Sequence, residues 1–377
     1  MFDKVLEKIF SVKNAEGCNN KVYKVITILG IKLKIKNNKK TFEKQQNILF
    51  NQMLEYQKML ITTPYVFQGR NLWEVPFFEK FANKLLNTDY EQDYKSLIKN
   101  LDKKSVETVN RILARIIYVK THDANGYDIF TTEEKEVIRL IPQVFNNNIL
   151  KLNEHCYAYN HYFLSENHFE VNVFRDKHEL ESLNINYFKD KNIIDAGGFI
   201  GDSAIVLSDY TTKNVYSFEP VKNNYDKMLQ TIHLNNKNNI IPIYCGLGEA
   251  EYNVNMLGEQ GSGCSVDISK KDEDAGVVKV ITLDKYVREN NLEVGLIKTD
   301  LEGYEQYFLR GAENTIKTQK PTLLISIYHN TDDFFNIKPI IESWNLGYKF
   351  RIVKPLDGHI LLETLLIAEI EPKAGNK

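Results

Sequence analysis

The sequence predicts an α/β protein whose sheet is mostly parallel and ends in an antiparallel hairpin, preceded by a mainly helical N-terminal domain. After residue 190, short apolar runs alternate with helical stretches, and strands connected by helices of this length pair in parallel. The first third of the chain has helical periodicity instead. The last two apolar runs, 347–353 and 361–370, flank a Pro-Leu-Asp-Gly turn, which predicts the hairpin at the sheet edge.

The 377 residues predict two domains of ordinary size. We expect residues 1–150 to form the N-terminal domain, with helices over 41–61, 72–87, 90–120 and 131–145. Within this domain, residues 21–44 contain eight Lys and one acid, and apolar residues alternate with Lys. The alternation predicts a basic β-ribbon, which is either a solvated surface or a contact for an anionic partner.

Residues 151–377 are predicted to form the α/β domain. Its strands are expected at 192–196, 214–218, 240–244, 296–298 and 322–327, and its helices at 221–234, 302–318 and 332–344. The stretch from 152 to 189 carries no pattern that assigns an element.

Composition excludes several classes of protein. Apolar residues make up 43% and charged residues 26%, as in ordinary globular domains. The 48 basic and 50 acidic residues leave a net charge of −2, whereas a protein that holds nucleic acid through phosphates is usually basic. The four Cys form no CxxC pair, which argues against a zinc site and a disulfide framework. Because no segment has the apolar core of a signal peptide or of a membrane span, we expect a cytoplasmic protein.

The most informative segment joins the first strand of the α/β domain to a helix. It reads Asp195-Ala-Gly197-Gly198-Phe-Ile-Gly201, and glycines in such a turn let a ligand approach the backbone at the helix N-terminus. The next strand ends in Glu219, 24 residues after Asp195. A carboxylate there can accept both ribose hydroxyls of an adenosine. The sequence therefore predicts a site for an adenosine-containing cofactor.

The kind of cofactor follows from two departures from the dinucleotide fingerprint. The loop lacks the second glycine of GxGxxG, and Asp195 adds negative charge where a pyrophosphate would need amide donors. S-adenosylmethionine carries a sulfonium and an ammonium but no phosphate. We favour this cofactor. The alternatives are a nicotinamide-dependent oxidoreductase and a binding or scaffold protein that keeps the fold without catalysis.

Six segments, in this order, resemble the FkbM family of S-adenosylmethionine-dependent methyltransferases. They are IIDAGGFIGDSA, VYSFEP, HLNNKNN, ITLDKYV, LIKTDLEGYEQYFLRGAENTI and LLISIYH, within about residues 190–370. The resemblance implies a Rossmann-like methyltransferase sheet with a reversed last strand, S-adenosyl-L-methionine as cofactor, and O-methylation, often of a sugar or a secondary metabolite. It also implies two sets of site residues: Asp195, Gly197, Gly201 and Glu219 in the cofactor motif, and Asp300, Glu302 and Gly303 in the Asp-x-Glu-Gly signature.

Three side chains near the ends of predicted strands are candidates for catalysis, namely Asp300, Glu302 and His329. Because the carboxyl ends of parallel strands meet at one edge of a sheet, we expect Asp300 and His329 beside the cofactor. Methyl transfer to a hydroxyl needs alignment of the acceptor oxygen and removal of its proton. Asp300 or His329 is predicted to accept or position this proton, with a histidine pKa near about 6.5.

Simpler roles remain open for several residues. Glu302 also fits a capping box with the threonine three positions before it. Glu305 fits a solvated position on the helix that follows, and His329 fits a structural histidine. His178 and His359 fit surface or packing positions.

The remaining expectations concern metals and partners. No metal is expected, because Asp300 and Glu302 lack a clear third ligand. The expected partner is a small-molecule or glycan substrate, without nucleic acid. The basic segment of residues 21–44 could contact a membrane periphery or a glycan-assembly partner, and the N-terminal domain could mediate a homo-oligomer.

Overall fold

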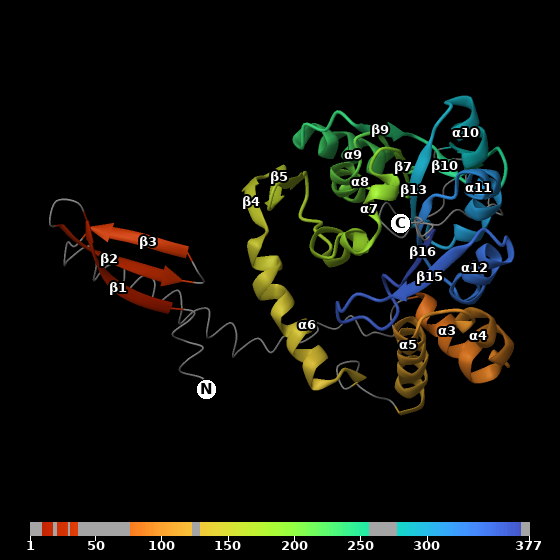
Figure 1. Cartoon of the computed structure of the whole chain (residues 1–377), viewed down its shortest axis with the longest axis horizontal. Coiled ribbons are helices and arrows are strands. Elements are labelled where there is room, and N and C mark those ends of the chain that lie inside the picture. The colour runs from red at the N-terminus through yellow and green to blue at the C-terminus, as the bar shows by residue number, and fades with distance from the viewer. Residues whose placement is uncertain are drawn as a thin grey trace, which may run out of the picture. The chain divides into compact units, whose positions relative to one another are not determined.

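The computed structural model of the chain describes residues 10–17, 21–28, 31–36, 76–122, 129–255 and 277–370. It divides into two compact units between Gly69 and Arg70, which are treated separately below (Figure 1). The helix predicted at 41–61 and the end of the predicted ribbon, residues 37–44, lie outside the described residues.

The described part of the first unit is a three-stranded antiparallel sheet. Its strands are β1 (Phe10–Gly17), β2 (Lys21–Ile28) and β3 (Ile31–Lys36), in the order β1-β2-β3. The register pairs Phe10 with Ile28 and Ile28 with Ile31. Strands β2 and β3 thus cover the described part of the segment in which the basic ribbon is predicted.

The second unit is organised around a seven-stranded sheet. In spatial order its strands are β15 (Tyr348–Val353), β16 (Leu365–Ile370), β14 (Thr322–Ser326), β13 (Val294–Thr299), β7 (Asn192–Ala196), β8 (Val215–Phe218) and β9 (Ile240–Ile243). Neighbouring strands from β14 to β9 are parallel. Strand β16 is antiparallel to both β14 and β15, so it is the reversed strand. The predicted α/β class and the C-terminal hairpin are confirmed.

Both faces of this sheet are covered by helices, because the side chains of its central strands alternate between two cores. One core contains Ile194, Ile297 and Leu323, and the other contains Ile193, Leu296 and Leu324. Helices α10 (Leu283–Glu289), α11 (Glu305–Gln319) and α12 (Thr331–Ser343) cover the first face. Helices α7 (Ile185–Phe188), α8 (Asp202–Leu207) and α9 (Lys222–Leu234) cover the second.

Three helices before residue 150 belong to the same core as the sheet. They are α3 (Pro76–Asn87), α4 (Glu91–Ile98) and α5 (Lys103–His122), which lie beside α12 and β15 (Figure 1). The ring of Phe81 packs edge-on against Phe334, with centroids 5.5 Å apart. The buried ammonium of Lys338 donates to the Lys99 carbonyl. Because of these contacts the structure divides the chain at Gly69, and not near residue 150 as predicted.

The stretch predicted as one helix over 90–120 is two helices. Helix α4 ends at Ile98, and Asn100 has a φ of 60°, which interrupts the helix. Asp102 then caps α5, because its carboxylate accepts hydrogen bonds from the backbone N–H and the hydroxyl of Ser105 at 3.0 and 2.6 Å.

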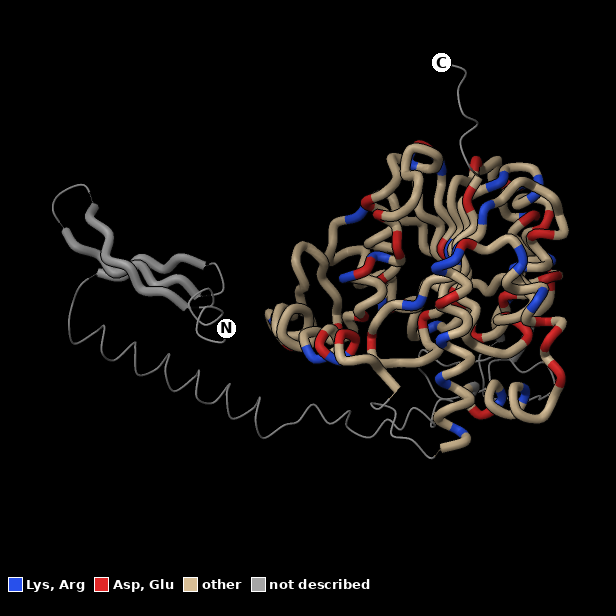
Figure 2. Tube along the Cα trace, turned by 60° about the horizontal axis from the view of Figure 1, so that its bottom comes forward, with Lys and Arg blue, Asp and Glu red and all other residues tan. Residues whose placement is uncertain are grey.

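The other elements of the second unit connect these layers. They are α6 (Thr132–Val144), β4 (Leu150–Asn153), β5 (Cys156–Tyr159), β6 (Tyr162–Leu164), β10 (Gly246–Leu247), β11 (Tyr252–Asn255), β12 (Val277–Ile281) and the short helical turns Asn146–Asn148, Val171–Arg175, Lys177–Ser182 and Ser208–Tyr210. Acidic and basic residues are interspersed over this unit (Figure 2). Among the described residues, no helix combines the length and apolarity that a membrane span requires.

Candidate active site

The candidate site lies where the strand order reverses. Strands β8 and β9 continue the sheet on one side of β7, and β13 and β14 continue it on the other. In open α/β sheets, ligands bind at such a point, outside the carboxyl ends of the strands. The loop after β7 carries the glycines, Glu219 follows β8, Asp300 follows β13, and His329 lies beyond β14.

The glycine loop is packed directly against the backbone that follows β13. Gly197 has a φ of +84°, and a Cβ there would lie 1.9 Å from the carbonyl oxygen of Asp300. A Cβ on Gly198 would lie 2.1 Å from the hydroxyl of Ser217, and Gly201 also has a φ of +84°. The glycines are therefore required by the packing and geometry of the loop itself.

Asp195 lies underneath the glycine loop and is fully buried. Its Oδ2 accepts a hydrogen bond from Ser217 Oγ at 2.7 Å, and its Oδ1 lies 3.4 Å from Lys298 Nζ. Lys298 also donates to the Gly197 carbonyl at 3.2 Å. Burial raises the pKa of Asp195, and Lys298 opposes that shift. Burial would lower the pKa of Lys298, but the charges of Asp195 and Asp300 outweigh it and raise that pKa. This pair holds the loop from below.

Glu219 lies at the end of β8 and faces the same loop. Its two carboxylate oxygens accept hydrogen bonds from the backbone N–H groups of Phe199 and Val221, at 2.8 and 2.7 Å. Burial raises the pKa of Glu219 to about 7, even though these hydrogen bonds oppose the shift. Glu219 therefore changes charge near neutral pH.

A further carboxylate lies at the start of the helix after the loop. Asp202 is the first residue of α8 and is 4% exposed. Burial and the nearby charge of Glu170 raise the pKa of Asp202 to about 7. An acid at the first turn opposes the binding of a phosphate there, where a helix N-terminus would otherwise attract one.

The three predicted catalytic residues lie together. His329 Nε2 is 3.1 Å from Asp300 Oδ1 and 3.9 Å from Glu302 Oε2. Burial would raise the pKa of Asp300, but His329 and Lys298 outweigh it and lower that pKa to about 2. Burial raises the pKa of Glu302 to about 7. Burial would lower the pKa of His329, but Glu305 and Asp300 outweigh it and raise that pKa well above its ordinary value.

Two expectations about the start of α11 are wrong. Glu305 is fully buried, not solvated, and its Oε1 lies 2.9 Å from His329 Nδ1. The capping box with Glu302 does not form, because Glu302 has a φ of 53° and α11 begins only at Glu305. The carboxylate of Glu305 instead accepts hydrogen bonds from the N–H groups of Leu301 and Gly303, at 2.8 and 3.0 Å.

Two groups of side chains among the described residues have possible metal-ligand atoms within 4.8 Å of one another: Asp300, Glu305 and His329, and His168, Glu170 and Asp202. In the first group the two ring nitrogens of His329 each face a different carboxylate. They lie on opposite edges of the imidazole, so one ion cannot contact both, and the arrangement is that of an ion-pair network. In the second group, His168 Nε2 is 3.1 Å from a Glu170 oxygen.

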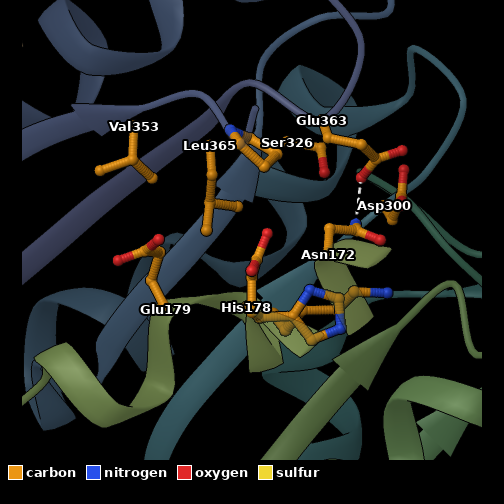
Figure 3. A pocket seen from close by; sticks show the side chains of 11 residues that line it. Asn172, His178, Glu179, Asp300, Ser326, Val353, Glu363 and Leu365 are labelled. Atoms are coloured by element: carbon orange, nitrogen blue, oxygen red, sulfur yellow. Dashed lines mark hydrogen bonds between the residues drawn. The ribbon is translucent and has the colours of Figure 1, made fainter. Parts of the chain in front are cut away.

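A small pocket opens at the carboxyl ends of β13 and β14 (Figure 3). Its polar lining includes Asn172, His178, Lys298, Asp300, Ser326 and Glu363. One wall is the turn Lys177–Ser182, in which three successive residues, starting at Lys177, have φ values of 50°, 49° and 62°. Such left-handed backbone is strained for residues other than glycine. Within it, His178 Nε2 lies 3.0 Å from Ser203 Oγ, and burial lowers the pKa of His178 to about 3.

Two carboxyl groups of the pocket lining share a hydroxyl group. Tyr328 Oη lies 3.2 Å from Asp300 Oδ1 and 3.3 Å from Glu363 Oε1. Asn172 donates a hydrogen bond to the other oxygen of Glu363 (Figure 3). Burial and the charge of Glu170 raise the pKa of Glu363 well above its ordinary value, whereas the pKa of Asp300 is lowered.

The family assignment agrees with the resemblance found in the sequence. Residues 195–352, from Asp195 to β15, match the family model described as the methyltransferase FkbM domain. This part of the chain is similar to the FkbM methyltransferase domain. The match supports a methyltransferase activity, and it covers the glycine loop, Glu219, Asp300 and His329.

Individual proteins similar to the FkbM domain are distant. "Methyltransferase 1" of Beauveria bassiana is 23% identical over 189 residues, 44% of this chain and 75% of that protein. A crystal structure of methyltransferase FkbM from Methylobacillus flagellatus has 19% identity and a TM-score of 0.48; the match covers 74% of this chain but only 59% of that one. A structure of M. jannaschii TYW2 in complex with AdoMet has 15% identity and a TM-score of 0.29, over 58% of this chain and 84% of that one.

The structure brings the predicted site residues to one edge of the sheet, while their roles in binding and catalysis stay predictions. The sequence analysis did not identify Lys298, Glu305, Asp202 and Glu363. A signal existed for Lys298, which is a charged residue inside an otherwise apolar strand. No signal existed for Glu305, because its burial depends on the approach of His329 from another strand.

Proposed function

We propose that the chain is an S-adenosyl-L-methionine-dependent O-methyltransferase that methylates a hydroxyl group, as in a sugar of surface-glycan or secondary-metabolite biosynthesis. The observation that supports S-adenosyl-L-methionine as the cofactor is the charge of the groups around the glycine loop. Asp202 and Glu219 add carboxylates at this loop, and Lys298, which contacts the Gly197 carbonyl, is buried and paired with Asp195. A sulfonium and an ammonium suit this set, and a pyrophosphate does not.

The residues that would hold the cofactor are Glu219 for the ribose hydroxyls and the backbone from Gly197 to Gly201 for its amino-acid part. When bound, the cofactor supplies a methyl group on a positively charged sulfur. Glu219 would accept hydrogen bonds from the ribose in its ionised form. Lys298 and Asp195 would keep the loop in place beneath it.

The pocket beyond β13 would hold the acceptor. Its lining includes Asn172, Ser326 and Asp300, side chains of types that donate hydrogen bonds to hydroxyl groups or accept them. Carboxyl groups outnumber the single lysine in its lining. A neutral, hydroxyl-rich group fits this lining better than a phosphate does, so any phosphate of the acceptor would lie outside the pocket.

Calorimetric titration of the full chain with S-adenosylhomocysteine, NAD and ATP tests the cofactor. We expect S-adenosylhomocysteine alone to bind at micromolar affinity or better. Tighter binding of NAD would favour the oxidoreductase, and no binding of any of the three would favour a scaffold. Transfer of labelled methyl from S-adenosylmethionine to a panel of monosaccharides then tests the acceptor class, with their fully O-methylated derivatives as controls.

We further propose that the basic segment of residues 21–44 contacts an anionic surface in the cytoplasm, such as the periphery of a membrane that carries glycan assembly. The eight Lys of this segment support the proposal. Flotation with vesicles of anionic and of zwitterionic lipids tests it, with a chain that begins at Arg70 as the control. Binding that does not depend on residues before Arg70 would contradict it.

A further inference from the structure

His329 lies between two carboxylates that approach opposite edges of its ring. Nδ1 is 2.9 Å from Glu305 Oε1, and Nε2 is 3.1 Å from Asp300 Oδ1. The imidazole side chain is 2% exposed. A neutral imidazole has one N–H and one lone pair, so it would turn a lone pair toward one of these carboxylates. The doubly protonated form presents an N–H to both.

Glu305 is fixed in its own position by the backbone. It has no exposed surface, and it accepts hydrogen bonds from the N–H groups of Leu301 and Gly303. Gly303 has a φ of +97°, a conformation that favours glycine, and this turn directs its N–H to Glu305. The loop between β13 and α11 is thus folded around the Glu305 carboxylate.

The other charged groups that face His329 come from three elements. Glu302, in the loop after β13, lies 3.9 Å from Nε2. On α12, burial and the charge of Glu305 raise the pKa of Asp333 to about 8. Lys298, at the end of β13, acts on Asp300 and is paired with Asp195. Carboxylates therefore dominate the surroundings of the ring.

We propose that Glu305 is a positioning residue that holds His329 as an imidazolium, with its Nε2–H directed at Asp300. The relevance of this arrangement to methyl transfer rests on the function proposed above. An imidazolium has no lone pair with which to accept the proton of the acceptor hydroxyl. His329 then acts through Asp300, which it keeps ionised at the wall of the pocket. Asp300 is the residue that contacts the acceptor hydroxyl.

The charge of His329 can be measured directly by nitrogen NMR on the full chain labelled with ¹⁵N-histidine. The sequence has eight His, and the spectrum of His329→Gln assigns the signal. At pH 8 we expect imidazolium shifts for His329, because each of its ring nitrogens faces a carboxylate. A neutral His329 at pH 8 would overturn the proposal. This measurement uses the wild-type protein, so it does not depend on whether any variant of Glu305 folds.

Glu305→Gln removes the charge and keeps the shape. We expect the proton affinity of His329 to fall at least about tenfold and methyl transfer to be lost, while S-adenosylhomocysteine binds with unchanged affinity. The matched control is Glu313→Gln on the same helix, where a 43% exposed side chain pairs with Lys317. An unchanged titration of His329 in Glu305→Gln would contradict the proposal. An imidazolium without any methyl transfer in the wild type would instead contradict the proposed function alone.

Discussion

Lys298 and Asp195 form an ion pair, 3.4 Å between Nζ and Oδ1, in which the side chains are 5% and 0% exposed. The two residues come from neighbouring parallel strands, where Lys298 and Asp195 occupy paired positions in the register of β13 and β7. The pair lies under the glycine loop and contacts it through the Gly197 carbonyl. The register of β13 and β7 therefore places the two side chains in contact, and their ion pair in turn fixes the position of the glycine loop.

Removing one partner of this pair should be costly. Lys298→Met leaves Asp195 charged and buried without its cation, which we expect to lower the free energy of unfolding by about 3–5 kcal/mol. Urea denaturation measures this change in the free energy of unfolding. In the double variant with Asp195→Asn, the loss should be smaller than in the single variant. The control is Lys317→Met, which removes a pair whose side chains are 40% and 43% exposed and should change stability by less than about 0.5 kcal/mol. Equal losses of stability in Lys298→Met and Lys317→Met would contradict the prediction.

Two glycines with the same backbone conformation allow the packing of the loop to be tested. Gly197 and Gly347 have φ values of +84° and +86°, but a Cβ on Gly347 meets nothing within 4 Å, whereas one on Gly197 meets the Asp300 carbonyl. Gly347→Ala should therefore cost only the conformational strain, about 1–2 kcal/mol. Gly197→Ala should cost clearly more and abolish binding of S-adenosylhomocysteine, because the loop and Asp300 must separate. Thermal unfolding measures the stability of the two variants, and calorimetry measures their binding of S-adenosylhomocysteine. Equal stability and equal binding in Gly197→Ala and Gly347→Ala would contradict the prediction.

Glu219 should make cofactor binding depend on pH. Its pKa of about 7 means that the carboxyl group is protonated at lower pH and ionised at higher pH. Because the ionised form accepts hydrogen bonds from both ribose hydroxyls, affinity for S-adenosylhomocysteine should rise as pH increases through 7 and then level off. Protonation of one required group limits the fall to about tenfold per pH unit. Glu219→Gln should bind more weakly with a flatter profile, and Glu251→Gln, at a 44% exposed side chain, should keep the wild-type profile.

The helices before residue 150 should be needed for folding. Phe81 is fully buried against Phe334, and Phe81→Ala should cost about 3–5 kcal/mol. Leu86, on the same helix and 44% exposed, provides the control, and Leu86→Ala should have little effect. A chain that begins at Arg70 should fold, and one that begins at residue 150 should aggregate. A soluble, cofactor-binding chain from residue 150 would show that α3–α5 are dispensable.

The strands around the site could be predicted closely, because each is a short apolar run that ends at a glycine or a charged residue. The run at 192–196 coincides with β7, and its neighbours differ by one or two residues. The helical periodicity of the first third also predicts helices where the structure describes them, although the stretch 90–120 is two helices and not one. Periodicity shows which face of a helix is apolar but not what covers it, and so it placed α3–α5 in a separate domain.

The electrostatic details of the site could not be predicted. The properties of His329 and Glu305 depend on atoms brought within 3 Å by two separate connections after β13 and β14. The backbone of Glu302, in a left-handed conformation, shifts the start of α11 and makes Glu305 the group that receives the loop amides. The sequence favours a capping box instead, because that motif requires only a threonine followed three positions later by a glutamate, as Thr299 and Glu302 are.

The buried amine of Lys298 has a consequence for chemical labelling. Its raised pKa keeps the amine protonated, and its 5% exposure keeps acylating reagents away from it. Such reagents modify an amine only when it is accessible and unprotonated, as lysines on the surface intermittently are. Acylation of Lys298 therefore requires its ion pair with Asp195 to open. The rate of this modification, followed by mass spectrometry, therefore measures how often the ion pair opens. A ligand that stabilises the glycine loop above the pair will slow the modification.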